Sequence, residues 1–364
     1  MASRVSSPVL IGRDEELERL SAAWRSAARG EPAIVLVGGE AGIGKSRLVT
    51  ELAAFARSDG GIVLEGACVS LGDDEGLPLA PIAEALRALG RQLPTDALAE
   101  VVGSAGASVA HLVPELGRAL ESGDAATRPD WVAARVLEAI LGVLGRLGER
   151  VPTLLIVEDL HWADRSTRDV LSYVARTSRD ERLLLVGTYR TDEIHRRHPL
   201  RPWLAEMERA PRVERLTIPR LGPEAVAGLI EAIRAEPADL QVARAIAERS
   251  DGNPFYAEEL LAAGALEAPG RLPADLRDVL LSRVAALPDE VSGLLGIAAV
   301  GGRSVEHELL RDVAGLDDEG VEEAMRAAVA AGIVEALDDG PLVSYAFRHA
   351  LLHEAVYDDL LPTE

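Results

Sequence analysis

The stretch GGEAGIGKSRL, residues 38–48, contains the only lysine of a chain of 364 residues, in which Lys and Arg together number 38. Arginine carries a rigid planar fork, whereas lysine carries a compact charge on a flexible stem. Gly39, Gly44, Lys45 and Ser46 satisfy the pattern G-x-x-x-x-G-K-[ST], which is typical of a phosphate-binding loop. A mobile ammonium can follow phosphate groups through a reaction, which explains why a lysine is kept at this one position.

The residues around the loop supply the context that the pattern requires. A β-branched apolar run, 34–39, precedes it, and 46–57 follow with helical spacing. Backbone N–H groups of such a loop point at phosphate oxygens, and the helix start adds the positive end of its dipole. We therefore expect a bound ATP or ADP, with Lys45 between the β- and γ-phosphates and Ser46 on Mg²⁺. The expected phosphate-binding residues are Gly39, Ala41, Gly42, Ile43, Gly44, Lys45, Ser46 and Arg47.

Four further strands are predicted, separated by helical stretches, at 61–67, 153–160, 182–190 and 213–218. The third strand of the chain is continuously apolar, as strands buried on both faces of a parallel sheet are. The first 219 residues are therefore predicted to form an α/β layered domain. The mostly helical interval 77–150 is too long for one crossover and is expected to elaborate this core.

Two carboxylates end the apolar strand in LLIVEDLHWAD, residues 154–164. Sheets of this kind bind ligands at the carboxyl ends of their strands. We expect Glu158 to support Mg²⁺ and Asp159 to orient or deprotonate the attacking water. The two roles could be exchanged, because strand alternation directs only one side chain squarely into the cleft. His161 and Trp162 follow the acids. Trp162 is expected to pack the helix onto the sheet, and His161 is not assigned a contact with the nucleotide, although a polar side chain there could lie near the γ-phosphate.

Arg190 ends the fourth strand in GTYR. If this strand lies between the other two, its end faces the γ-phosphate, where an arginine could sense that group or stabilise developing charge. The alternative is an ordinary exposed arginine at a strand terminus.

Bulk composition excludes several classes of function. The formal net charge of −22 argues against a polyanion as main partner, because phosphate backbones are held by clustered cations. The single cysteine, Cys68, excludes a disulfide framework and fits a small buried side chain. No segment approaches the roughly 20 apolar residues that span a bilayer, and the N-terminus lacks a signal core. The sequence therefore predicts a cytoplasmic protein without a membrane partner.

After Pro219 the pattern becomes helical. Helices are predicted at 274–286, 289–300, 305–314 and 318–331, and a hairpin at 332–349, the outline of a winged helix. The predicted domains are a nucleotide-binding domain at 1–219, a helical lid at 220–268 and a winged helix at 269–364, beginning with the linker PGRLP (269–273). From Pro273 to Glu364, six arginines face 19 acids, so direct DNA binding by this segment is not expected.

Five segments occur in an order that resembles the STAND class of signal-transduction ATPases. They are LIGRDEELERL (10–20), GGEAGIGKSRL, LLIVEDLHWAD, LLLVGTYR and SDGNPFYAEELL (250–261). The chain is most similar to the ATPase region of large ATP-binding LuxR-type transcriptional regulators, related to the maltose-regulator family, from about residue 9 to its end. The resemblance implies a P-loop NTPase with an ASCE/AAA-like parallel sheet, followed by a helical domain and a winged-helix domain.

The resemblance also implies nucleotide contacts outside the phosphate loop. Ile11, Gly12 and Arg13 are candidates for adenine contacts, as is Pro254 of the GNP segment. The alternative for the first group is helix capping, with Asp14 ahead of an amphipathic helix.

A winged-helix histidine can approach the bound diphosphate in this class and lock the inactive state. His349 is the candidate here, although His353 lies one turn away and either could be structural.

The function implied is a switch that closes on ADP and opens to self-associate with ATP, either alone or together with a small-molecule or protein inducer. Slow Mg²⁺-dependent hydrolysis would reset it. The alternatives are a turnover ATPase of AAA+ type and an ATPase module attached to a nucleotide cyclase or kinase. Regulators of this type continue into helical repeats and a DNA-binding helix-turn-helix, so a chain that stops at LLPTE is expected to be an isolated or truncated switch module.

Overall fold

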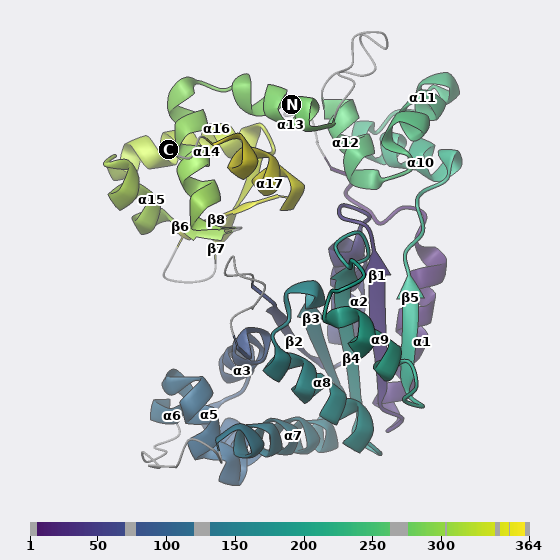
Figure 1. Ribbon diagram of the computed structural model, residues 1–364, viewed down its shortest axis with the longest axis vertical. Helices are drawn as coiled ribbons and strands as arrows, with labels where there is room; N and C mark the ends of the chain where they lie inside the picture. The colour runs from purple at the N-terminus through teal and green to yellow at the C-terminus, as the bar shows by residue number, and fades with distance from the viewer. Residues whose placement is uncertain are drawn as a thin grey trace. The chain divides into compact units, whose positions relative to one another are not determined.

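The computed structural model describes residues 6–69, 78–119, 132–262, 276–302, 304–338, 343–348 and 350–360. The chain forms two compact units. One comprises Arg13–Glu40 and Gly44–Pro219, and contains the large sheet (Figure 1). The other comprises Met1–Gly12, Ala41–Ile43 and Arg220–Glu364. Within the described ranges, no helix has the length and apolar character needed to cross a membrane.

A five-stranded parallel sheet organises the first unit, with the strand order β2-β3-β4-β1-β5. Its central strands are buried along almost their whole length, whereas β5 at the edge exposes Glu214 and Arg215. The strands predicted from sequence are thereby confirmed. They are β1(Ala33–Gly39), β2(Ile62–Ala67), β3(Thr153–Glu158), β4(Leu183–Arg190) and β5(Val213–Thr217).

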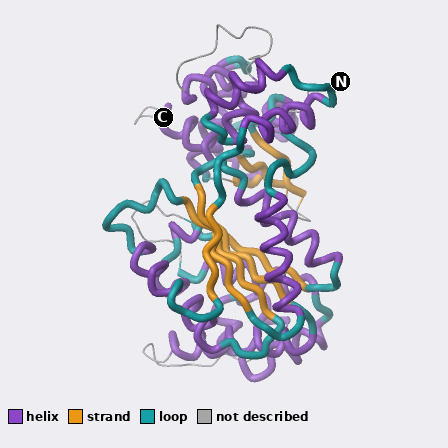
Figure 2. Tube along the Cα trace, turned by 90° about the vertical axis from the view of Figure 1, so that its right-hand side faces the viewer, coloured by secondary structure: helices purple, strands orange, loops and turns teal. Residues whose placement is uncertain are grey.

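Helices cover both faces of this sheet (Figure 2). On one face α1(Asp14–Ala28) packs beside α2(Lys45–Ser58). Their fully buried Trp24 and Leu52 show why these stretches read as amphipathic. The remaining helices of the core are α8(Arg165–Thr177), which contributes Val170 and Leu171 to a large apolar cluster with the sheet, and α9(Leu200–Met207). Burying the strands on both faces requires the continuous apolar runs seen in the sequence.

A helical insertion joins β2 to β3, as the interval 77–150 predicts. It packs through buried side chains such as Leu89, Val109 and Val143. Cys68 follows β2 and is buried as expected, and burial raises the pKa of its thiol to about 12. The helices of the insertion are α3(Ala80–Gln92), α4(Thr95–Val102), α5(Gly106–Leu112), α6(Pro114–Ala119) and α7(Val132–Arg150), with a 3₁₀ turn at Gly103–Ala105.

The second unit begins with three helices that share one apolar cluster: α10(Pro223–Arg234), α11(Leu240–Ser250) and α12(Pro254–Ala262). The elements after them surround a three-stranded antiparallel sheet of order β6-β8-β7. Phe255 of α12 is buried in the cluster of these later elements, so the two helical parts share core residues. The later elements are α13(Leu276–Ala285), α14(Asp289–Gly301), β6(Ser304–Glu306), α15(His307–Ala314), α16(Asp318–Ala330), β7(Val334–Asp338), β8(Val343–Phe347) and α17(Ala350–Asp359).

One expectation about this unit was wrong. The sequence predicts no strand between Pro219 and the hairpin, yet β6 pairs with β8. This strand has three residues, and only Val305 is buried, so it carries too little pattern to be recognised. The predicted hairpin is confirmed as β7 and β8. The predicted linker 269–273 lies outside the described residues.

Gly66 of β2 offers a test of this packing. A Cβ at this position would lie 2.1 Å from the backbone oxygen of Pro81 in α3, which cannot yield as a side chain could. We expect Gly66→Ala to lower the free energy of unfolding by roughly 1–3 kcal/mol or more, as overpacking does. Gly145→Ala, in α7 with nothing within 4 Å, should be neutral or stabilising by up to about 1 kcal/mol. Urea unfolding of both variants measures the difference, and equal midpoints would contradict this packing.

Candidate nucleotide-binding site

The loop between β1 and α2 has the backbone of an anion-binding turn. Gly42 and Gly44 have φ angles of 73° and 99°, in the left-handed region that glycine adopts without strain. Gly44 is the N-cap of α2 and provides no side-chain cap for the helix. The first N–H groups of α2 are therefore of the kind that a phosphate can accept from.

Lys45 is buried, with 8% of its surface exposed. Its ammonium donates to the carbonyl oxygens of Gly39 at 2.9 Å and Glu40 at 2.8 Å. Burial, assisted by the charge of Arg190, lowers the pKa of Lys45 to about 8. Three carboxylates oppose this shift from nearby, Asp159, Asp192 and Glu158. A desolvated ammonium of this kind gains strongly from an added phosphate.

Ser46 and Glu158 are brought together at the ends of α2 and β3. The Ser46 hydroxyl donates to Glu158 Oε2 at 2.5 Å. A hydroxyl and a carboxylate with this separation present the hard oxygen ligands that Mg²⁺ prefers, beside water and phosphate oxygens. Among the described residues, no group of three or more His, Cys, Asp or Glu side chains could hold a metal ion. With one hydroxyl and one carboxylate, the Ser46–Glu158 pair would leave Mg²⁺ positions for water and phosphate oxygens, as an ion shared with a nucleotide requires.

Asp159 has a different environment from its neighbour. It is 7% exposed and has a φ of 57°, an uncommon backbone for a residue other than glycine. Its N–H donates to Thr188 Oγ1 at 3.1 Å, which ties the end of β3 to β4. Its carboxylate lies 3.9 Å from His161 Nε2. The two acids are thus distinguished by geometry, one beside Ser46 and the other in a buried polar group.

Arg190 ends β4, which lies between β1 and β3 as the functional interpretation of this arginine requires. Its register partner on β1 is Gly39. The guanidinium is buried, pairs with Glu193 and lies 5.3 Å from the centre of the Trp162 ring. The alternative of an ordinary exposed arginine is wrong, because only 5% of Arg190 is exposed.

Glu193 is a residue that sequence reasoning missed. It pairs with Arg190 through one oxygen, and its other oxygen lies 3.3 Å from His161 Nε2. The Arg190 N–H donates to His161 Nδ1 at 3.4 Å, so Nε2 carries the proton of the neutral imidazole and faces the carboxylates. The only signal in the sequence is the spacing of Glu193 three residues after the arginine.

The predicted adenine contacts fall in two parts of the structure. Ile11 and Gly12 lie next to Gly228 and Ala225 of α10. Arg13 belongs to the other unit, where it is 3% exposed and pairs with Glu16 at 4.0 Å. Burial lowers its pKa.

Helix capping does not explain the GR segment in the way the sequence suggests. The N-cap of α1 is Arg13, which makes no side-chain cap, and Asp14 is the first helical residue. The acidic first turn, with Asp14, Glu15 and Glu16, instead complements the positive end of the helix dipole.

Four sequence-derived candidates remain, of which the structure places three. Pro254 is the first residue of α12 and is half-buried. Arg47 donates to Glu51 along α2 at 3.3 Å. His349 lies outside the described residues, and its neighbour Arg348 donates to Glu258 at 2.6 Å. His353 of α17 donates from Nε2 to the Ala299 carbonyl of α14 at 2.8 Å, which is a structural contact.

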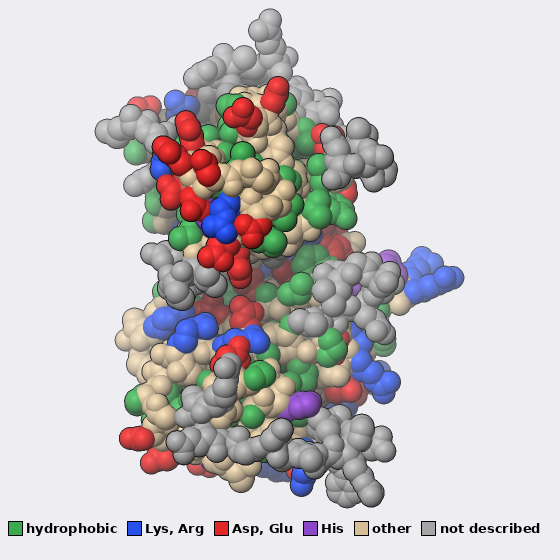
Figure 3. Space-filling view, turned by 90° about the vertical axis from the view of Figure 1, so that its left-hand side faces the viewer, with side chains coloured by type: hydrophobic (Ala, Val, Ile, Leu, Met, Phe, Trp, Pro, Cys, Tyr) green, Lys and Arg blue, Asp and Glu red, His purple; other side chains and the backbone are tan. Residues whose placement is uncertain are grey.

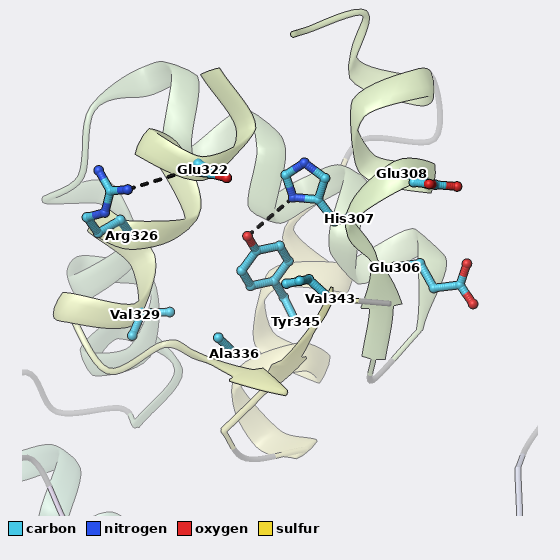
Figure 4. Close-up of a pocket in the computed structure, with 9 residues that line it drawn as sticks. All are labelled: Glu306, His307, Glu308, Glu322, Arg326, Val329, Ala336, Val343 and Tyr345. Carbon is cyan, nitrogen blue, oxygen red and sulfur yellow. Dashed lines mark hydrogen bonds and ion pairs between the residues drawn. The ribbon is translucent and has the colours of Figure 1, made fainter. Parts of the chain in front are cut away.

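A cavity of about 440 Å³ lies among α15, α16 and the small sheet (Figure 4). Tyr345 and His307 meet within it at 3.3 Å. Its lining includes three glutamates, Glu306, Glu308 and Glu322, against the single cation Arg326, which pairs with Glu322. This excess of carboxylates repels phosphate groups, so the nucleotide site is assigned to the loop around Lys45 and not to this cavity.

Acidic side chains also gather on one face of the molecule (Figure 3). On α15 and α16, Glu308, Asp312, Asp318, Glu319 and Glu323 are exposed. A DNA-reading surface needs clustered cations, which this surface lacks. The excess of acids counted in the sequence from Pro273 to Glu364 is thus displayed on these two helices.

Comparison with known proteins supports these features. Residues 9–186 match the family model described as AAA ATPase domain. Over 388 aligned positions the chain is 28% identical to an uncharacterized protein of Rhizobium meliloti (strain 1021), covering 98% of this chain and 36% of that protein.

One solved structure shows a similar fold. The chain is similar to a Signal Transduction ATPase with Numerous Domains (STAND) protein with a tetratricopeptide repeat sensor from Pyrococcus horikoshii. The TM-score is 0.56 with 15% identity, over 99% of this chain and 44% of that chain. A RuvB variant from Thermotoga maritima aligns over 96% of both chains with a TM-score of 0.37 and 15% identity, which is too low to support an argument. The chain thus spans less than half of the relative and of the STAND structure.

The pKa of Lys45 leads to a pH-dependent prediction. Below about pH 8 the ammonium is already charged, so ADP binds without proton uptake. Above it, binding must recharge the lysine, and affinity should fall by up to about tenfold per pH unit. Titration calorimetry between about pH 7 and pH 10 measures this slope. Lys45→Arg, whose charge persists over this range, should bind more weakly but with a flat profile. A flat profile for the unmodified protein would contradict the assignment.

Proposed function

We propose that this ATPase module of the STAND and AAA+ type is the nucleotide-operated switch of a signal-responsive transcriptional regulator, as the LuxR-type resemblance implies. The observation that carries nucleotide binding is the buried Lys45 ammonium in its glycine loop, beside the Ser46–Glu158 pair. The AAA ATPase match over residues 9–186 agrees with it. The regulated output and the inducer are inferred from the resemblance alone.

Each site residue then has a proposed role. Lys45 contacts the β- and γ-phosphates, and Ser46 and Glu158 hold Mg²⁺, which neutralises phosphate charge when bound. Asp159 orients or deprotonates the attacking water, and its burial beside His161 supplies the fixed position that this role needs. Arg190 senses the γ-phosphate. Its pairing with Glu193 supports this role, because an incoming phosphate would compete with a carboxylate for the guanidinium.

Outside the phosphate loop, Ile11, Gly12, Arg13 and Pro254 are proposed to contact adenine, and His349 to approach the diphosphate. The elements α13–α17 with β6–β8 are proposed to form a winged helix. Helices followed by a hairpin, with an added third strand, support that description. These elements are proposed to act as a nucleotide-dependent lid, and the acidic surface of α15 and α16 favours this role over DNA binding.

The lid helix α12 carries two adjacent buried glutamates, each paired with an arginine of the C-terminal elements. Glu258 accepts from Arg348 at 2.6 Å and from the Ser7 N–H at 3.1 Å. Glu259 pairs with Arg283 of α13. Burial raises the pKa of Glu258 despite the opposing charge of Arg348.

These pairs support a closed state with a defined arrangement of lid and C-terminal elements. Removing one partner of a buried pair leaves an uncompensated charge at a cost of about 3–5 kcal/mol. Switching requires that ADP and ATP bind two arrangements with different affinity, because a ligand shifts an equilibrium only by that difference. We propose that ADP favours the closed arrangement, and that ATP with an inducer favours an open form that self-associates.

A second candidate is a turnover ATPase of the AAA+ type, which the family match also favours. The two candidates differ in rate. Steady hydrolysis near about 1 s⁻¹ or faster lies in the ordinary range of enzymes and would favour turnover. A switch instead retains its product.

Lys45→Ala should abolish ATP binding, because it removes the ammonium that the loop holds toward the phosphates. Direct titration calorimetry measures this loss. Glu158→Gln should keep ADP binding but weaken the affinity for Mg²⁺ by roughly tenfold or more, because a neutral amide is a poorer Mg²⁺ ligand than a carboxylate. Retained ATP affinity in the lysine variant would refute the site.

Arg348→Ala should open the switch. We expect ADP dissociation, followed with a fluorescent ADP analogue, to accelerate by roughly tenfold or more, since about 1.4 kcal/mol already gives tenfold. Arg326→Ala is the matched control, because its pair with Glu322 is exposed at 3.6 Å and such pairs contribute little. Equal ADP dissociation rates in the two variants would argue against a role of the Glu258–Arg348 ion pair in holding the closed state.

The experiment that tests the proposed function is to denature purified protein and identify the released nucleotide by ion-exchange chromatography. Near-stoichiometric ADP is the expected result, since a closed switch traps its product. An empty site that turns ATP over freely would favour the ordinary ATPase. A protein that neither carries nor binds nucleotide would refute both candidates.

A further inference from the structure

Asn253 is the only asparagine in the chain, and it binds the loop that contains the only lysine. Its Nδ2 donates to the Ala41 carbonyl at 2.8 Å, across 212 residues of sequence. Asn253 is 2% exposed, and both residues belong to the same compact unit. A buried side-chain hydrogen bond of this range holds the tip of the phosphate loop directly.

The same side chain begins α12. Its Oδ1 accepts from the Phe255 N–H at 3.1 Å, and its own carbonyl accepts from the Ala257 N–H at 3.0 Å. Asn253 is therefore the N-cap of α12, with Pro254 in the first helical position. One amide group thus caps a helix with its oxygen and holds a loop with its nitrogen.

The loop is also packed against α12. Besides its bond to Asn253 Oδ1, the Phe255 N–H donates a second, longer hydrogen bond to the Gly42 carbonyl at 3.4 Å. A Cβ at Gly42 would lie 2.8 Å from the Phe255 Cβ and 3.1 Å from Asn253 Oδ1. Only glycine fits between them with a φ of 73°.

These contacts fix the direction of backbone donors. A trans peptide is planar, so the N–H of Gly42 points opposite to the carbonyl of Ala41, and the N–H of Ile43 opposite to that of Gly42. Holding both carbonyls toward α12 turns both N–H groups the other way. A loop of this kind binds anions through successive N–H groups that point the same way. The orientation is thereby set before an anion arrives.

We propose that Asn253 is a positioning residue that presets the phosphate-binding loop by holding the Ala41 carbonyl, and that it makes nucleotide affinity depend on the position of α12. The proposal rests on the proposed nucleotide binding. It assigns to the GNP segment a task at the phosphates, in addition to the adenine contact proposed for Pro254. Because Phe255 is buried in the C-terminal core, a displacement of that core is transmitted to the loop.

The test separates loop positioning from helix capping. Asn253→Ser keeps a good N-cap oxygen but cannot reach the Ala41 carbonyl, whereas Asn253→Ala removes both functions. Asp239→Ala is the matched control, because Asp239 caps α11 of the same lid, accepting from Gln241 N–H at 2.7 Å, and is exposed. Each variant is measured for ADP and ATP affinity by calorimetry, for thermal stability, and for hydrogen exchange at residues 41–43 in the nucleotide-free protein.

We expect Asn253→Ser to weaken ADP and ATP binding by about tenfold or more, the effect of one buried hydrogen bond, with little loss of stability. Exchange at residues 41–43 should rise in the same variant. Asp239→Ala should lose some stability and keep its affinity. Unchanged nucleotide affinity and unchanged exchange in Asn253→Ser would overturn the proposal. It would also be overturned if, across the three variants, nucleotide affinity fell only in proportion to the loss of thermal stability. If the unmodified protein bound no nucleotide, the proposed function would fail. Hydrogen exchange at residues 41–43 would still test whether the Asn253–Ala41 hydrogen bond positions the loop.

Discussion

The candidate site is organised around one buried ammonium. The Lys45 ammonium is removed from water and held by two carbonyls of its own loop, and its pKa falls accordingly. Carboxylates at the end of β3 offset part of that cost. The strand order brings them into range, because β4 alone separates β1 from β3. A parallel sheet of this topology therefore places the glycine loop, the two acids and the arginine together at the carboxyl ends of β1, β3 and β4.

The features that are best predicted from the sequence are those that depend on a short run of neighbouring residues. Lys45 stands in a loop between an apolar strand and an amphipathic helix, so local pattern alone identifies its place and its chemistry. Glu158 and Asp159 follow from the same logic. Sequence could not assign their separate roles, because the distinction depends on Ser46 reaching one acid and His161 lying near the other.

Long-range side-chain contacts were beyond prediction for a physical reason. Asn253 contacts Ala41 across 212 residues, and Glu258 meets Arg348 across 90. Neither pairing leaves a periodic signal, since each depends on how separate helices pack. The three-residue strand β6 was not predicted for a related reason. Its stability comes from pairing with β8 and not from its own composition.

The position of Trp162 gives the module an optical property. The Arg190 guanidinium lies 5.3 Å from its ring centre, whereas Trp24 and Trp203 are buried with their N–H groups bound to Asp59 and Ser172. The emission of an indole responds to a charge held above its ring. Movement of the arginine therefore changes the fluorescence of this one tryptophan, so the chain reports the position of the proposed γ-phosphate sensor without an added label.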